Sequence, residues 1–221
     1  MDKASIFSHV DHTLLAATSS WEEMKKLCAE AIMYQVASVC IPSGYVKRVV
    51  DTYGKKVTVC TVVGFPLGYQ KTEIKLAETK TAILDGAKEV DMVINIGDVK
   101  NGDFDVVTAE IKALKEAVGD KILKVIIETC YLTEEEKIKL CNCVTEAGAD
   151  YIKTSTGFGT AGATREDILL FKENIGANVK IKAAGGIRTV EDMVDFIELG
   201  CERLGTSSAV KILSGDKATD Y

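Results

Sequence analysis

The sequence has few of the residues that interrupt a compact fold. Its 221 residues include only 2 prolines, and no stretch is of low complexity. Prolines and low-complexity stretches are typical of linkers between domains, so their scarcity argues against a second domain. The length suits one domain, and 47% hydrophobic residues are enough to bury a large core. We therefore expect a single domain over residues 1–221.

The chain also lacks an excess of positive charge and a long apolar run. Its net charge is −6 and its isoelectric point is about 5.1, which disfavours a broad surface for nucleic acids or anionic membranes. No apolar run approaches the length that spans a bilayer, and the amino terminus lacks the basic-then-apolar pattern of a signal peptide. We expect a cytoplasmic protein with neither nucleic-acid nor membrane partners. A small phosphate site is compatible with this charge, since it needs only a few amides and one cation.

The seven cysteines do not form a metal-binding pattern. The sequence contains no CxxC motif, and Cys141 and Cys143 lie in a helical pattern without a second cluster. Structural zinc sites and disulfide frameworks both show paired spacings of cysteine. We therefore expect reduced thiols, a reducing compartment and no metal site.

A strand-and-helix unit recurs along the chain. The strand-like segments are Val10–Leu15, Val36–Ile41, Val57–Phe65, Glu89–Ile96, Ile122–Thr129, Tyr151–Ser155, Val179–Ala184 and Arg203–Thr206. The last five follow a glycine where glycine commonly ends a helix in a left-handed conformation: Gly86, Gly119, Gly148, Gly176 and Gly200. Helix-start patterns occur at Ser19–Glu22, Thr133–Glu136, Thr164–Asp167 and Thr189–Asp192. Eight such units predict a parallel (β/α)₈ barrel, known as a TIM barrel, whereas a doubly wound open sheet would not need eight.

The segment Tyr151–Gly159 places a lysine inside a strand. Because strand side chains alternate between two faces, Tyr151, Lys153 and Ser155 are expected on the same face. An unpaired buried ammonium is costly, so an interior lysine needs a carboxylate partner or a catalytic role. Lysine is a candidate nucleophile for imine formation at such a position, and a structural ion pair is the alternative.

Because TIM barrels carry their functional groups at the carboxyl ends of the strands and in the loops after them, the polar residues that interrupt the other apolar strand segments are also candidates. The full set is Asp11, Asp91, Asn95, Lys124, Glu128, Lys153 and Lys182. Buried charges need partners, so several of these residues are expected to form one interior network. Lys124 and Glu128 share a strand face, and we expect them to be interior partners, in a structural pair or in one that orients the site.

Loops rich in glycine and hydroxyl residues follow the last three strands. They contain Thr156, Gly157, Gly159, Gly185, Gly186, Gly205, Ser207 and Ser208. Glycines let a backbone approach a ligand closely, and a short helix is expected to begin after Ser208. The loops after strands seven and eight are where TIM barrels commonly bind phosphate. The sequence therefore predicts a phosphate site on this rim.

Six stretches together resemble the deoxyribose-phosphate aldolase family. They are Asp11–Leu15, Glu89–Val93, Val125–Thr129, Ile152–Gly157, Ile181–Thr189 and Gly205–Ser208, in the family's order. Members of this family are class I aldolases on a (β/α)₈ barrel that cleave 2-deoxy-D-ribose 5-phosphate reversibly to glyceraldehyde 3-phosphate and acetaldehyde. The resemblance implies a small phosphorylated sugar as the substrate, no metal or organic cofactor, and a homodimer as one assembly.

On the matching positions, the resemblance implies that Lys153 is the Schiff-base nucleophile. Asp91 and Lys182 would then move protons through a bound water. Lys180 and Lys182 share one face of their strand, and so do Asp91 and Asn95, so the alternation of side chains does not distinguish the members of either pair. Only the resemblance selects Lys182 and Asp91. For the substrate and its phosphate, we expect contacts from Asp11, Thr13, Thr156, Gly157, Gly185, Gly186, Gly205, Ser207 and Ser208. Asp11 and Thr13, at the end of the first strand, could instead extend the proton network.

Two positions qualify the resemblance. Some relatives carry a lysine where this chain has Phe158, so a phosphate contact from that side chain is absent here. Tyr221 is the last residue, and in some relatives a terminal tyrosine reaches into the site. Two other functions share the glycine rim. An isomerase or synthase of sugar phosphates would not need two interior lysines. A catalytically inactive barrel that binds a phosphorylated metabolite and regulates a partner would not need Lys153 and Asp91.

Overall fold

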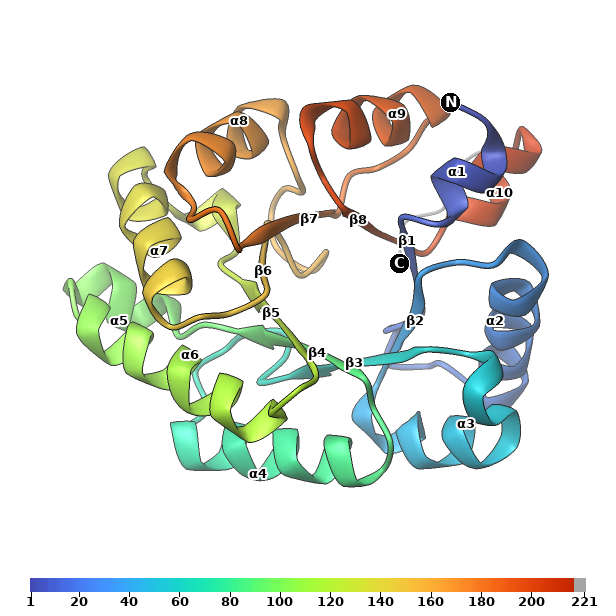
Figure 1. Cartoon of the computed structure of the whole chain (residues 1–221), viewed down its shortest axis with the longest axis horizontal. Helices are drawn as coiled ribbons and strands as arrows, with labels where there is room; N and C mark the ends of the chain where they lie inside the picture. The colour runs from blue at the N-terminus through green and yellow to red at the C-terminus, as the bar shows by residue number, and fades with distance from the viewer. Residues whose placement is uncertain (217–221) are drawn as a thin grey trace.

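Eight parallel strands form a closed barrel at the centre of the molecule, and helices surround it (Figure 1). The computed structural model describes residues 1–216. Each strand pairs with its neighbours in sequence, and β1 pairs with β8 to close the sheet. The predicted (β/α)₈ barrel is confirmed, and the alternative of an open sheet is wrong.

Several strands end earlier than predicted on their carboxyl side. The strands are β1 Val10–Thr13, β2 Ser38–Ile41, β3 Val59–Val63, β4 Glu89–Val93, β5 Ile122–Ile126, β6 Tyr151–Lys153, β7 Lys180–Ala184 and β8 Arg203–Thr206. The residues that follow β6 no longer belong to the strand but remain buried, among them Thr154 and Ser155. Burial of these residues made the strand segments look longer in the sequence than they are.

Helices cover the outside of the barrel. They are α1 Lys3–Phe7, α2 Trp21–Tyr34, α3 Val46–Tyr53, α4 Thr72–Leu84, α5 Ile96–Asn101, α6 Phe104–Val118, α7 Glu134–Glu146, α8 Arg165–Asn174, α9 Val190–Leu199 and α10 Ala209–Ser214, with short 3₁₀ turns η1 Ser43–Tyr45, η2 Gly54–Lys56 and η3 Thr129–Tyr131. Reciprocal capping boxes begin α2 at Ser20, α7 at Thr133 and α9 at Thr189. The patterns predicted the starts of α7, α8 and α9, and that of α2 to within one residue. They did not predict α1, α5 or the 3₁₀ turns.

Two of the predicted left-handed glycine caps differ in the structure. Gly119 follows α6 with φ of 61° and ψ of −120°, outside the left-handed helical region, and Gly176 does not end a helix. Helix α8 ends at Asn174, and Ile175 follows it in an extended conformation. Gly176 donates its N–H to Thr145 Oγ1 at 2.9 Å, and a Cβ on it would lie 2.4 Å from Thr145 Cγ2. Close packing against α7 therefore requires glycine at this position. Gly200, in contrast, ends α9 in the predicted left-handed conformation, with φ of 110°.

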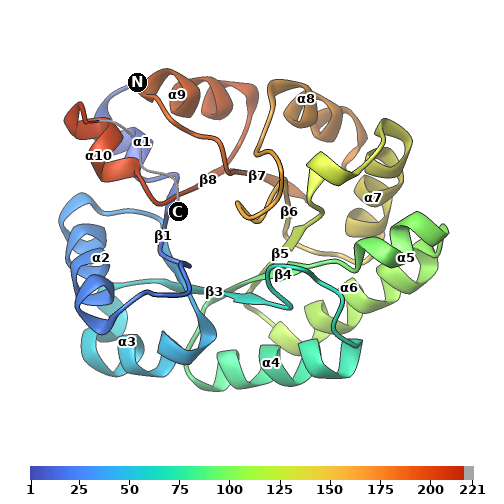
Figure 2. The ribbon, with the colours of Figure 1, turned by 180° about the vertical axis from the view of Figure 1, so that it is seen from behind.

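The hydrophobic core lies between the barrel and its helices. Val90 and Met92 of β4 belong to the same buried cluster as Ile111, Leu114 and Val118 of α6. Strand side chains that point the other way face the barrel interior, and there many of the buried residues are charged. Over residues 1–216, no helix combines the length and apolarity that a membrane crossing needs. The segment after β6 turns inward across the barrel, as Figure 2 shows from behind.

Candidate active site

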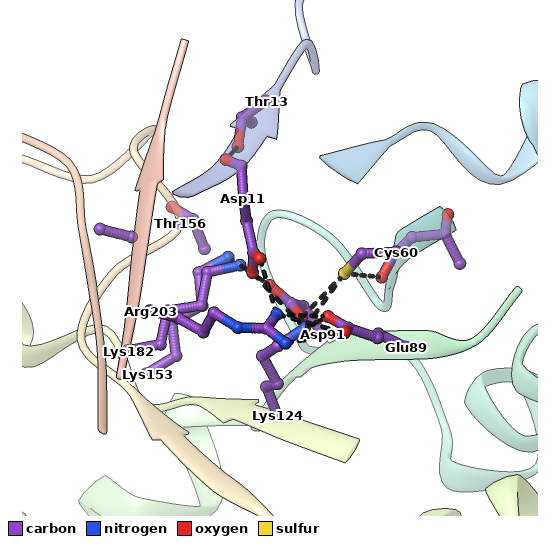
Figure 3. Close-up of polar contacts among 12 residues, drawn as sticks. Asp11, Thr13, Cys60, Glu89, Asp91, Lys124, Lys153, Thr156, Lys182 and Arg203 are labelled. Atoms are coloured by element: carbon purple, nitrogen blue, oxygen red, sulfur yellow. Dashed lines mark hydrogen bonds and ion pairs between the residues drawn. The ribbon is translucent and has the colours of Figure 1, made fainter. Parts of the chain in front are cut away.

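Seven charged side chains meet in the barrel interior (Figure 3). They are Asp11 on β1, Glu89 and Asp91 on β4, Lys124 on β5, Lys153 on β6, Lys182 on β7 and Arg203 on β8. Arg203 is 15% exposed, and the other six side chains are 4% exposed or less. Strand register explains their convergence, because Asp91 is paired with Lys124, and Lys153 with Lys182, on adjacent strands. We call these seven residues the ion cluster.

Asp91 lies at the centre of the ion cluster. Its Oδ2 is 2.8 Å from Lys153 Nζ and 2.7 Å from Lys182 Nζ, and its Oδ1 is 3.0 Å from Lys124 Nζ. Burial alone would raise the pKa of Asp91, but Lys124, Lys153 and Lys182 outweigh it and hold the pKa well below its usual range. Asp91 is therefore a carboxylate at neutral pH, with one oxygen shared by two lysines.

Lys182, and not Lys180, is the lysine of β7 that enters the site. Lys180 is 49% exposed and forms an ion pair with Glu202 at 3.0 Å. Lys182 is fully buried, and its Nζ is 2.5 Å from Asp11 Oδ2. Burial lowers the pKa of Lys182, but Asp11 and Asp91 outweigh this effect and raise the pKa above its usual range. Lys182 is therefore an ammonium in the resting protein.

Asn95 plays no part in the ion cluster. It is the residue before α5, and its side-chain oxygen accepts a hydrogen bond from Gly97 N at 3.1 Å. Strand β4 ends at Val93, so Asn95 no longer follows the alternation of the strand. The position nearer the carboxyl end thus serves a helix, and Asp91 is the residue of this segment that faces Lys153.

Lys124 and Glu128 do not pair with each other, contrary to the prediction. Lys124 Nζ is 2.5 Å from Glu89 Oε2 and also contacts Asp91. Glu128 lies beyond the end of β5 in a left-handed conformation, with φ of 55°, so the alternation that put both residues on one face has ended. Its carboxylate accepts hydrogen bonds from Thr156 N, at 3.0 Å, and from Thr156 Oγ1. Burial raises the pKa of Glu128.

Asp11 belongs to the ion cluster and does not line the cavity that lies above it. It has no exposed surface, and its oxygens contact Lys182 and Arg203. Of the two roles considered for Asp11, the contacts favour the network, and the contact with a substrate hydroxyl stays a prediction. Thr13 does line the cavity, and its Oγ1 donates to Asp11 O at 2.7 Å.

A cavity of about 240 Å³ opens at the carboxyl ends of β6, β7, β8 and β1. Lys153 is the only member of the ion cluster that lines it, among the residues that the structure describes. The predicted residues Thr13, Thr156, Gly157, Gly185, Gly186, Gly205, Ser207 and Ser208 all line it too. Gly205 packs closely against β7, since a Cβ there would lie 3.0 Å from Lys182 Cε and 3.1 Å from Ala184 Cβ. The predicted glycine rim is therefore assembled around a single lysine.

The predictions missed part of this cavity and of the cluster beneath it. Leu15, the loop 159–162 and Arg188 line the cavity, and Glu89 and Arg203 complete the ion cluster. Arg188 stands within the Ile181–Thr189 stretch, which could have drawn attention to it. A Cβ on Gly162 would lie 2.2 Å from the carbonyl carbon of Gly185, which shows how closely the two loops approach.

Phe158 is not among the residues that line the cavity. Its ring packs edge-on against Phe65, with centroids 5.4 Å apart and planes at 90°. This contact joins the loop after β3 to the loop after β6. The expected contribution of Tyr221 concerns a residue outside the described part of the chain.

The carboxylates and thiols of the interior are poorly suited to a metal ion. Cys40, Cys60 and Asp91 have ligand atoms within 4.8 Å of one another, as do Asp11, Cys60 and Glu89. Each carboxylate is already in contact with a lysine or arginine. A metal cation there would face four neighbouring positive side chains, so these groups are better described as partners of lysine.

Comparisons with known proteins agree with this arrangement. Residues 6–209 match the model of the DeoC/LacD family aldolases. The deoxyribose-phosphate aldolase of Clostridium botulinum (strain Alaska E43 / Type E3) is 66% identical over 221 residues, the whole of both chains. That of Clostridioides difficile (strain 630) is 60% identical over 98% of this chain and 99% of its own length.

Solved structures give the same result. The deoxyribose phosphate aldolase from Aeropyrum pernix, described as a unique tetramer, superposes with a TM-score of 0.88 at 30% identity, over 97% of this chain and 92% of that chain. An aldolase called QR15 has a TM-score of 0.90 at 38% identity, over 95% of each chain. The family match and the full-length identities agree with the barrel and its buried lysines, and the chain therefore belongs to the DeoC/LacD family of aldolases.

Proposed function

We propose that this protein cleaves 2-deoxy-D-ribose 5-phosphate reversibly to D-glyceraldehyde 3-phosphate and acetaldehyde, through a Schiff base on Lys153. One observation carries the proposal: a single lysine of the ion cluster reaches the cavity, with its Nζ 2.8 Å from a buried carboxylate. The names of the relatives supply the substrate, because curated deoxyribose-phosphate aldolases are 60% and 66% identical over nearly the whole chain. An isomerase or a silent barrel would leave this lysine unexplained.

The chemistry begins with the Lys153 amine, which adds to the aldehyde carbon C1 of the open-chain sugar. Loss of water gives an iminium ion, and its positive nitrogen is an electron sink. A base then removes the proton of the C3 hydroxyl, and the C2–C3 bond breaks to release glyceraldehyde 3-phosphate. The electron pair of that bond remains on the other fragment as an enamine. Protonation of the enamine at C2 and hydrolysis of the imine return the amine and release acetaldehyde.

Asp91 and Lys182 are the proposed acid and base for these proton transfers. Asp91 Oδ2 contacts both amines, at 2.7 Å from Lys182 Nζ and 2.8 Å from Lys153 Nζ, so Asp91 connects Lys182 to the proposed nucleophile. Neither lines the cavity, so a water between them and the substrate would carry the protons. When Lys153 is converted to a neutral enamine, Asp91 loses a charged partner and becomes a better proton acceptor.

The phosphate is proposed to bind on the rim formed by Gly185, Gly186, Ser207 and Ser208. The two glycines have φ of 76° and 73°, a conformation that favours glycine, and backbone amides in such turns commonly bind anions. Arg188 lines the same cavity and adds a guanidinium, the side chain best suited to phosphate. Phe158 contributes no cation, so the rim and Arg188 would bind the phosphate together.

A homodimer in the cytoplasm completes the proposal. The resemblance to the family supports a dimer, while the Aeropyrum pernix relative is described as a tetramer. Light scattering after size-exclusion chromatography would distinguish a dimer of this 23.9 kDa chain from a monomer or a tetramer.

Trapping of the imine tests the proposal directly. The protein is incubated with acetaldehyde and sodium borohydride, which reduces an imine to a stable secondary amine, and its intact mass is measured. We expect one ethyl group per chain, mapped to Lys153 by peptide analysis and lost in Lys153→Ala. Lys180→Ala removes a lysine that is half exposed on a neighbouring strand and should leave the adduct unchanged. An unmodified protein, or labels spread over surface lysines, would contradict the imine mechanism.

A further inference from the structure

The ion cluster extends beyond Asp91, away from the cavity. Glu89 and Arg203 are the first residues of β4 and β8, so they lie toward the amino-terminal end of the barrel. Neither side chain is among those that line the cavity, and neither is therefore in a position to touch the substrate. Their contacts nevertheless connect them to Asp91 through two chains of ion pairs (Figure 3).

The first chain begins at the guanidinium of Arg203. Its Nη1 is 2.8 Å from Asp11 Oδ1 and 2.9 Å from Glu89 Oε2, and its Nη2 is 3.1 Å from Glu89 Oε1. A planar guanidinium with several donors holds two carboxylates in a fixed relation, which an ammonium does not. The other oxygen of Asp11 contacts Lys182, 2.5 Å away, and Lys182 contacts Asp91.

The second chain begins at the carboxylate of Glu89. Its Oε2 is 2.5 Å from Lys124 Nζ, and the same Nζ is 3.0 Å from Asp91 Oδ1. Lys124 has no exposed surface, so water does not replace a lost partner without a rearrangement. If Glu89 is removed, Lys124 is expected to move its full charge toward Asp91, in competition with Lys153 and Lys182.

We propose that Glu89 and Arg203 are positioning residues for the reaction at Lys153: through Lys124 and Asp11 they hold Asp91 and Lys182 in place and set the charge beneath the cavity. This inference rests on the proposed function and extends it to two residues outside the cavity. Because the two residues carry opposite charges, their removal has opposite electrostatic effects. Loss of Glu89 makes the interior more positive and favours release of protons near the cavity, and loss of Arg203 has the reverse effect.

Other titratable groups face Lys153 from the elements around it. Asp91 on β4 and Lys182 on β7 belong to the ion cluster, Glu128 follows β5, and Cys40 lies on β2. Asp11, Lys124 and the Cys60 thiol, 3.1 Å from Asp91 Oδ1, lie deeper. All of these groups remain in the variants described next, so differences between the variants report on Glu89 and Arg203 alone.

The experiment compares Glu89→Gln, Arg203→Met, the double variant and Arg203→Lys. For each, kcat and KM for 2-deoxy-D-ribose 5-phosphate are measured across pH, with folding checked by circular dichroism. Each of the two single charge removals should lower kcat about tenfold to a hundredfold and leave KM within about twofold, because the phosphate rim is intact. The acid limb of the kcat profile should move down by about 1 pH unit in Glu89→Gln and up by about as much in Arg203→Met, as for one charge in a medium of effective dielectric about 20.

Two further variants keep the result interpretable if a single variant fails to fold. The double variant restores the charge, so its acid limb should return to the wild-type pH while its kcat remains low. Arg203→Lys keeps the charge and loses the planar donor geometry, so only its kcat should fall. Glu202→Gln, next to Arg203 but 53% exposed, is the matched control and should change neither quantity.

Three results would overturn the inference. They are acid limbs that move in the same direction in both single variants, limbs that do not move in folded variants, or a double variant with wild-type kcat. The borohydride adduct separates this outcome from failure of the proposed function. A wild-type protein without an adduct on Lys153 refutes the proposed function itself, whereas an adduct with unmoved limbs refutes only the roles of Glu89 and Arg203.

Discussion

Replacement of Asp91 by asparagine should strongly destabilise the fold. Asp91 is fully buried, and its carboxylate contacts the ammonium groups of Lys124, Lys153 and Lys182 at 3.0, 2.8 and 2.7 Å. An asparagine has nearly the same shape but no charge, so Asp91→Asn leaves these groups in place without their common counterion. The effect is therefore electrostatic and creates no cavity.

The expected magnitude follows from the cost of an uncompensated buried charge. At an effective dielectric of about 20, each contact near 2.8 Å is worth about 6 kcal/mol of attraction, and most of it is offset by the desolvation of Asp91. Measured costs of removing one partner from a buried ion pair are about 3–5 kcal/mol. We expect Asp91→Asn to lower the free energy of unfolding by this amount, a large share of the ~5–15 kcal/mol typical of a domain.

The loss of unfolding free energy in Asp91→Asn should become smaller in acid. The pKa of Asp91 is held well below its usual range in the folded protein, so the carboxylate stabilises the fold fully at pH values above the unfolded pKa of about 3.9. That contribution is lost as the pH falls toward the folded pKa. The difference in free energy between the wild type and Asp91→Asn should therefore be constant from about pH 5 to pH 8 and should shrink below about pH 4.

Urea unfolding of both proteins at several pH values measures this difference. The dependence of the unfolding free energy on urea concentration should have the same slope in both proteins, since the same surface is exposed on unfolding. Asp51→Asn removes a carboxylate from the exposed pair with Lys47, 3.0 Å away, and serves as the matched control, with an expected change below ~0.5 kcal/mol. If Asp91→Asn unfolds at the wild-type urea concentration, or if its deficit does not shrink in acid, the interior charges are not coupled as their distances indicate.

Three further predictions concern other parts of the molecule. Of the seven cysteines, Cys130 alone is not buried, so a thiol reagent at pH 8 should modify one cysteine rapidly in the native protein and all seven after unfolding; burial raises the pKa of Cys28 to about 11 and those of Cys141 and Cys201 to about 12. Rapid reaction of a second native thiol would contradict this burial. Gly162→Ala should raise KM about tenfold or more and lower the free energy of unfolding by about 1–3 kcal/mol, because its Cβ would meet the Gly185 carbonyl at the cavity; an unchanged KM would show that the two loops separate freely. Lys75→Met leaves the buried Glu110 without its partner at 2.8 Å and should lower the free energy of unfolding by about 3–5 kcal/mol, whereas Lys75→Met with Glu110→Leu should recover most of it; equal losses would contradict the ion pair as the cause.

The sequence was sufficient for the barrel and for the lysine at its centre. Periodicity and glycine positions predicted the eight strand-and-helix units, because buried parallel strands are short, apolar and separated by helices of ordinary length. Lys153 stood out because an ammonium in such a strand requires a partner. The glycine rim was predictable for a related reason, since loops after the last strands of a barrel share one end of the fold.

Partnerships between side chains were not predictable to the same degree. Lys124 and Glu128 were expected to pair because alternating side chains would put both on one face of the predicted strand. The strand ends at Ile126, however, and Glu128 contacts Thr156 instead. Glu89 and Arg203 were missed because a charged residue at the first position of a strand is ordinary on a surface. Only the closure of the barrel, which brings β8 beside β1, shows that Arg203 points inward to Asp11.

The closure between β1 and β8 has a consequence for how the protein is made. Asp11 is separated in sequence by 171 positions from Lys182 and by 192 from Arg203, its two closest charged partners. A chain emerging from the ribosome therefore carries Asp11 long before either cation has been synthesised. Burying an acidic or basic group without its counterion is costly, so a partial barrel keeps these groups hydrated. The ion cluster around Lys153 is therefore complete only after the last strand has paired with the first, so an unfinished barrel lacks the charge balance of the finished one.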